Sequence, residues 1–64
     1  MILNGKNVEL ENEITIDELL SIYKIDNSRV VVELNMEIIS KDDYKKIKVK
    51  SKDTIEVISF VGGG

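Results

Sequence analysis

The segment "TIEVISFVGGG" (residues 54–64) joins a strand-forming run directly to three glycines, with no polar linker between them. Alternate side chains of a strand point to opposite faces of its sheet. Ile55 and Val57 therefore share one face, and Glu56, Ile58 and Phe60 share the other. If a helix covers the first face, the second is left open to solvent. We expect Ile58 and Phe60 to form an apolar patch there that binds a partner.

The three glycines at residues 62–64 make a thin chain segment that can enter narrow channels. Gly62, Gly63 and Gly64 have no Cβ, so they can thread a channel that excludes other residues and carry a terminal carboxylate into it. From Val61 onward the end reaches about 14 Å from the sheet when extended. A carboxylate is a poor electrophile, and conversion to an acyl-adenylate with ATP removes that obstacle. A frayed end without a role is the alternative interpretation.

The opposite end of the sequence, "MILNGKNVEL", predicts a β-hairpin. Both central residues of a type I′ turn need a positive φ, and Asn-Gly is the pair that adopts it most readily. With Asn4 and Gly5 at the centre, Leu3 faces Lys6. The residues then expected on one face of the hairpin are Met1, Leu3, Val8 and Leu10.

An amphipathic helix is predicted after the hairpin. Thr15 and Glu18 have the spacing of a capping box, in which each side chain accepts a hydrogen bond from the other residue's backbone N–H. An apolar stripe follows at positions i, i+3, i+4 and i+7. It consists of Ile16, Leu19, Leu20 and Tyr23. We expect the helix to end at Asp26-Asn27-Ser28.

Short strands and turns fill the segment between the helix and residue 54. Val30 to Leu34 is rich in β-branched residues and predicts a strand. The other expectations are a turn at Asn35-Met36, a short strand "EII", a helical turn capped by Ser40, a Tyr44 side chain that covers the core, an alternating strand "IKVK" and a turn at Ser51-Lys52-Asp53.

The order of hairpin, helix and later strands predicts an α+β fold. The helix must cross the sheet to bury its stripe, and we expect the last strand to join the sheet beside the first. This is the β-grasp (ubiquitin-like) arrangement, a mixed sheet of about four to five strands on one helix. We expect it to occupy residues 1–60, with a flexible glycine tail over residues 61–64.

Composition excludes several classes of function. The 64 residues carry a net charge of −3 and include no cysteine and no histidine. Disulfides and the usual zinc ligands are therefore absent, and we expect neither a metal nor a cofactor. The acidic balance argues against nucleic acid, and no apolar run approaches the ~20 residues of a membrane span. The N-terminal sequence lacks the features of a signal peptide, so we expect a cytoplasmic protein. We also expect it to be a monomer when free.

Two groups of charged residues have plain structural explanations. The lysines between Lys45 and Lys50 alternate with apolar residues, which is typical of a solvated strand face. The paired carboxylates Asp42-Asp43 and Glu11/Glu13 have no histidine or metal-ligand set near them. We therefore expect no catalytic residues, and a protein that is not itself an enzyme.

The sequence resembles the ThiS family, the small sulfur carrier proteins of thiamine biosynthesis. The resemblance covers essentially the whole chain, and its most specific part is the block "DTIEVISFVGGG" that ends on glycine. The other matching segments are "LNGK" (3–6), "TIDELL" (15–20), "VVVELNMEII" (30–39) and Tyr44. Family members often carry Asn-Gly where this chain has Asn35-Met36.

The resemblance implies a mechanism that acts on the chain end. A ubiquitin-activating-type enzyme would adenylate the Gly64 carboxylate, and a persulfide on a sulfur-donor protein would displace AMP to leave a thiocarboxylate. Thiazole synthase would then take the sulfur for the thiazole ring. Gly62 and Gly63 would provide access, while Ile58, Phe60 and Val61 would dock onto partners.

Three other functions remain open at this point. The same chemistry serves molybdopterin synthase, whose small subunit is usually longer. A ubiquitin-like modifier would instead join its terminal glycine to a lysine. A plain binding module would carry an idle tail.

Overall fold

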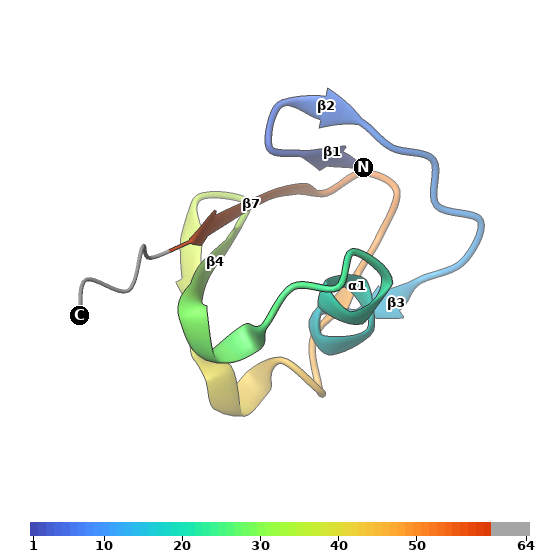
Figure 1. The fold of residues 1–64 in the computed structure, drawn as a ribbon. Helices are drawn as coiled ribbons and strands as arrows, with labels where there is room; N and C mark the ends of the chain where they lie inside the picture. Colours follow the sequence, from blue (N-terminus) through green and yellow to red (C-terminus); the bar gives the residue numbers. More distant parts are fainter. Residues whose placement is uncertain (60–64) are drawn as a thin grey trace.

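The computed structural model describes residues 1–59. Five strands form one mixed sheet in the order β2-β1-β7-β4-β5, and helix α1 lies on one side of it (Figure 1). This confirms the β-grasp arrangement. The elements are β1 (Ile2–Leu3), β2 (Lys6–Asn7), β3 (Ile14–Thr15), α1 (Ile16–Ile22), the 3₁₀ turn η1 (Asn27–Arg29), β4 (Val30–Leu34), β5 (Glu37–Ile39), the 3₁₀ turn η2 (Lys41–Asp43), β6 (Lys48–Val49) and β7 (Thr54–Ser59).

The N-terminal hairpin forms as predicted. Asn4 and Gly5 have φ values of 50° and 84°, the left-handed conformation that a type I′ turn requires. Leu3 lies opposite Lys6 in the antiparallel pairing of β1 with β2. The second hairpin, between β4 and β5, also has two left-handed residues, Asn35 at 51° and Met36 at 73°.

Helix α1 begins with the predicted capping box. Thr15 Oγ1 accepts from the Glu18 N–H at 3.0 Å, and Glu18 Oε1 accepts from the Thr15 N–H at 2.8 Å. Two further N–H groups of the first turn, of residues 16 and 17, donate to the carbonyls of Ile47 and Tyr44 at 3.1 and 2.9 Å. The segment after η2 therefore completes the cap of the helix.

The predicted end of the helix is wrong by several residues. The last helical residue is Ile22, and Lys24 adopts a left-handed φ of 57°. The N–H groups of Lys24 and Ile25 donate to the carbonyls of Ser21 and Leu20, which is the Schellman pattern of helix termination. Tyr23 lies at the C-cap with 44% exposure, so it is not part of the buried stripe, contrary to the prediction.

Strand β7 lies in the middle of the sheet, between β1 and β4. It pairs parallel to β1, with Ile55 opposite Leu3, and antiparallel to β4, with Val57 opposite Val32. The prediction that the last strand joins the sheet beside the first is confirmed. The pairing of β1 with β7 joins the two ends of the described chain.

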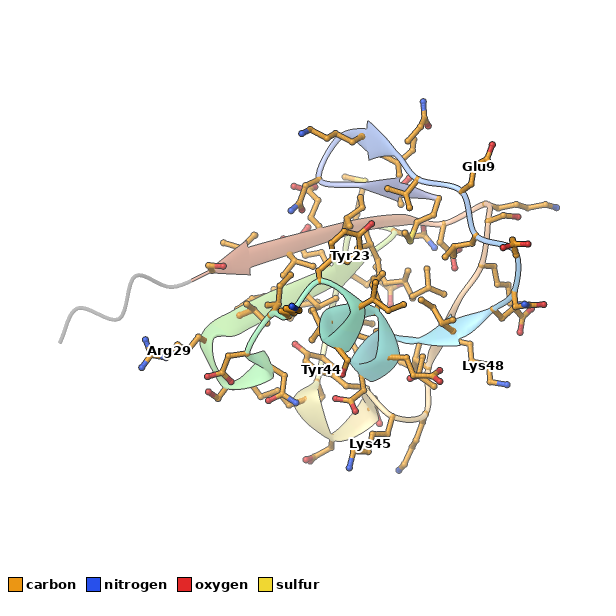
Figure 2. All side chains as sticks on the ribbon, turned by 45° about the vertical axis from the view of Figure 1, so that its right-hand side comes forward. Glu9, Tyr23, Arg29, Tyr44, Lys45 and Lys48 are labelled. Atoms are coloured by element: carbon orange, nitrogen blue, oxygen red, sulfur yellow. The ribbon has the colours of Figure 1, made fainter. Side chains whose placement is uncertain are left out.

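A second, two-stranded sheet was not predicted. Strand β3 pairs antiparallel with β6, with Ile14 opposite Val49. Of the expected strand "IKVK", only Lys48 and Val49 have strand geometry. The lysines of this segment are exposed, as predicted, and Lys45 and Lys48 point outward at separate places (Figure 2).

The core lies between α1 and the sheet. Tyr44, whose side chain was predicted to cover the core, is 2% exposed and packs within it near α1 (Figure 2). Burial raises the pKa of its phenol above the ordinary value, with an opposing effect from a hydrogen bond to the Val32 backbone. The buried residues of the core are Met1, Ile16, Leu19, Leu20, Val30, Val32, Tyr44, Val49 and Ile55. Within residues 1–59, no helix is long and apolar enough to cross a membrane.

Candidate functional site

Strand β7 separates a buried face from an exposed one, as its alternation predicts. Ile55 is fully buried and Val57 packs against the core. Ile58 points to the other side of the sheet and is 46% exposed. The prediction that Ile58 faces away from the helix is confirmed.

Two turn asparagines hold β7 in place. Asn35 Oδ1 accepts from the Thr54 N–H at 2.9 Å, at the start of the strand. Asn4 Oδ1 accepts from the Val57 N–H at 2.8 Å, further along the strand. Asn35 Nδ2 also donates to Asp53 Oδ1 at 3.0 Å. These contacts therefore hold in place the strand that directly precedes residues 60–64.

On the side of the sheet that faces away from α1, neighbouring strands add exposed side chains to those of β7. Here this surface is called the open face, and it is defined by Ile2, Val31, Glu33, Ile38, Glu56 and Ile58. Its isoleucines are well exposed, with Ile38 at 72% and Ile2 at 39%. Met36, in the turn beside it, is 90% exposed. Large apolar side chains gathered on one sheet face are typical of a surface that binds another protein.

The pairing of the strands arranges the open face in rows. Val31 lies opposite Ile58 across β4 and β7. In the next row, Glu33 lies opposite both Glu56 on β7 and Ile38 on β5. The open face therefore has two facing carboxylates with apolar side chains beside them.

The remaining predicted site residues lie outside the described part of the chain. They are Phe60, Val61, Gly62, Gly63 and Gly64. Their roles in docking, access and sulfur attachment remain predictions. Of the predicted site, the structure therefore places Ile58 alone.

Sequence reasoning missed most of the open face. Ile2 and Ile38 belong to short strands, and their place beside Ile58 depends on pairings between distant segments. One usable signal was the alternation in "RVVVEL", which puts Val31 and Glu33 on the same side of a strand.

Within residues 1–59, no group of three or more acidic, histidine or cysteine side chains is arranged to hold a metal ion. A hollow in the described surface is lined by Met1, residues 7–11 and Ser51, and it does not include Ile58. The features of the described structure that bear on function are the exposed apolar side chains of the open face and strand β7, which directly precedes residues 60–64.

Comparison with known proteins identifies the family. The model of the ThiS family matches residues 1–64. The chain is 44% identical to the sulfur carrier protein ThiS of Bacillus subtilis (strain 168) over 63 residues, which is 97% of this chain and 96% of that protein. It is also 33% identical to a thiazole synthase of Paramagnetospirillum magneticum over 64 residues, but this segment is only 20% of that protein.

Solved structures agree with the sequence matches. The crystal structure of the thiamine biosynthesis protein ThiS from Geobacter metallireducens superimposes with a TM-score of 0.84 at 33% identity, covering 98% of this chain and 96% of that one. These matches favour thiamine biosynthesis over the molybdopterin and modifier alternatives. The chain belongs to the ThiS family, the sulfur carrier proteins of thiamine biosynthesis, as its sequence predicted.

Proposed function

We propose that this sulfur carrier works through the carboxylate of Gly64. An enzyme of the ubiquitin-activating type transfers AMP from ATP to that carboxylate and releases pyrophosphate. The terminal sulfur of a protein persulfide then attacks the acyl carbon, and AMP leaves. A thiol cleaves the resulting acyl disulfide and frees the Gly64 thiocarboxylate, which supplies sulfur for the thiazole ring.

The match to the ThiS family over all 64 residues carries this proposal. The sequence adds a chemical argument, because it contains no cysteine. Without a thiol of its own, the chain has no side chain on which sulfur could be carried as a persulfide. The chain end is the group that remains for this task.

Partner binding is assigned to the side of the sheet next to the tail. Ile58 is exposed on β7, two residues before Phe60. We propose that Ile58, Phe60 and Val61 dock onto the adenylating enzyme and onto thiazole synthase, while Gly62 and Gly63 pass through their channels. The occurrence of a segment like this chain within proteins named thiazole synthase supports the second partner.

The carrier has a passive part in this chemistry. Its partners supply the catalytic groups, and we propose that it is not an enzyme, is a monomer when free and works in the cytoplasm.

Mass spectrometry tests the proposal directly. The chain is incubated with its cognate adenylating enzyme, ATP and a persulfide donor, and its intact mass is measured. We expect a gain equal to the difference between one sulfur and one oxygen atom, placed on Gly64 by fragmentation. An unchanged mass, with an adenylating enzyme shown to be active, would contradict the proposal. Omission of ATP is the control.

A further inference from the structure

Glu33 and Glu56 face each other at the centre of the open face. They are directly opposite in the antiparallel pairing of β4 with β7. Like charges in this position destabilise a sheet. Neither carboxylate makes an ion pair or a side-chain hydrogen bond with the described residues, whose one salt bridge joins Arg29 to Asp26. The arrangement is therefore unfavourable for the isolated domain.

Apolar side chains lie beside the two carboxylates on the open face. Ile38 lies beside Glu33 in the same row, and Val31 and Ile58 form the adjacent row. Ile38 and Ile58 are 72% and 46% exposed, so a partner that covers them also removes water from the carboxylates. Burying two negative charges in this way is costly unless a positive charge accompanies them.

We propose that the open face binds a surface of thiazole synthase that inserts an arginine side chain between Glu33 and Glu56. Apolar side chains around that arginine cover Val31, Ile38 and Ile58. The inference rests on the proposed function, and it deepens it by naming the chemistry that the partner presents.

Charge complementarity selects this occupant. A second copy of this chain, placed face to face, would bring four carboxylates together in an apolar interface. An arginine instead neutralises the pair, and its planar guanidinium has enough donors to bridge two carboxylates at once. A lysine has a compact ammonium group with fewer donors and a larger hydration penalty. Arginine is also enriched at the centres of protein interfaces.

The comparisons favour thiazole synthase as the protein that supplies the arginine. In Paramagnetospirillum magneticum and Magnetococcus marinus, a segment similar to this chain is part of a protein named thiazole synthase and makes up 20% and 19% of its length. Joining two domains in one chain raises their effective concentration for each other. Such a fusion is expected for domains that act on each other directly.

Calorimetric titration against thiazole synthase from the same organism tests the proposal. The variants are Glu33→Gln and Glu56→Gln, which keep shape and hydrogen-bonding capacity but remove one charge each. Glu37→Gln is the matched control, since Glu37 is next to Ile38 on β5 but points to the other face. We expect the dissociation constant to rise about tenfold to a hundredfold for the first two variants, as for loss of a charge-assisted hydrogen bond. For Glu37→Gln we expect no change.

Thermal melting and salt dependence separate binding from folding. Removing one of two facing charges relieves repulsion, so Glu33→Gln and Glu56→Gln should melt at the same temperature as the wild type or higher. Weaker binding with unimpaired stability is a combination that a merely structural role does not produce. The wild-type affinity should fall with added salt, and this dependence should be smaller in both variants.

Four results would overturn the inference. They are unchanged binding in both glutamine variants, tighter binding in them, no binding of thiazole synthase by the wild type, and a wild-type chain that sediments as a dimer through this face. The mass measurement on the same samples keeps the two proposals apart. A chain that gains sulfur but binds independently of Glu33 and Glu56 retains the proposed function and loses this inference alone.

Discussion

Asn4 combines two structural roles in one residue. Its φ of 50° allows the hairpin to turn, and its side chain accepts the hydrogen bond from Val57 N–H at 2.8 Å. A backbone N–H of β7 would otherwise lose its partner at this point. The residue therefore joins the first hairpin to the strand that leads into the tail.

Substitutions at Asn4 separate these two roles. Asn4→Gly keeps the left-handed conformation and loses the hydrogen bond, so we expect it to lower the free energy of unfolding by about 1 kcal/mol. Asn4→Ala loses the bond and adds the strain of a left-handed residue with a Cβ, roughly 1 kcal/mol more. Urea denaturation measures both. Equal losses would show that the backbone conformation contributes nothing.

Met36 presents the opposite case, because its conformation is unfavourable and no buried contact offsets it. The residue has a φ of 73° and is 90% exposed. We expect Met36→Gly to raise the free energy of unfolding by about 0.5–1 kcal/mol, since glycine adopts this conformation without strain. Lys24→Gly, at a φ of 57° in the helix C-terminus, should have a similar effect and is the comparison variant. A loss of stability in both denaturation curves would refute this account.

At the scale of single elements, the capping box makes helix α1 sensitive to acid. Hydrogen bonds with Thr15 lower the pKa of Glu18 below its ordinary value of 4.5, and the bond with the backbone has a larger effect than the bond with the side chain. The folded state therefore binds this proton less tightly than the unfolded chain. The stabilisation from Glu18 is complete above 4.5 and is lost as the pH falls through the lower folded value.

Glu18→Gln tests this dependence. Glutamine can still accept the Thr15 hydrogen bond, but it does not titrate. We expect the wild type to unfold less readily than the variant at neutral pH, and the difference between their unfolding free energies to shrink in acid. The measurement is denaturation over a pH series, with Glu13→Gln as a variant of equal charge outside the box. A difference that stays constant with pH would contradict the assignment.

Local signals explain which elements were predictable. The hairpin, the start of α1 and strand β4 each have a short-range signature, in Asn4-Gly5, the Thr15–Glu18 spacing and a β-branched run. The end of α1 has none, because Lys24 occupies the left-handed position that glycine usually fills. Strand β6 lies within the predicted alternating run "IKVK", but β3 and its pairing with β6 have no short-range signature.

At the scale of the whole molecule, the β-grasp topology was predictable but the open face was not. A single amphipathic helix between a hairpin and later strands leaves few ways to bury its stripe. The rows of the open face depend instead on the register of β4 with β5 and β7. The alternation along the last strand placed Glu56 on the outward side with Ile58, but the pairing that sets Glu33 opposite it was not visible in the sequence.

Deletion of Gly64 tests the separation between the domain and its tail. The buried residues in the described structure all lie between Met1 and Ile55. We therefore expect the deletion to abolish the sulfur-dependent mass gain and to leave the melting temperature nearly unchanged. Addition of one alanine after Gly64 is the control for the identity of the terminal residue. A large fall in melting temperature would contradict the proposed division of the chain.

The central place of β7 has a consequence for biosynthesis. Because β7 lies between β1 and β4, residues 1–53 cannot complete the main sheet while the ribosome still holds the segment that follows. The strand that closes the sheet also directly precedes the residues to which we assign sulfur attachment. If the proposed function holds, a nascent or prematurely terminated chain lacks both at once, and we expect sulfur to be loaded only onto molecules whose translation has finished.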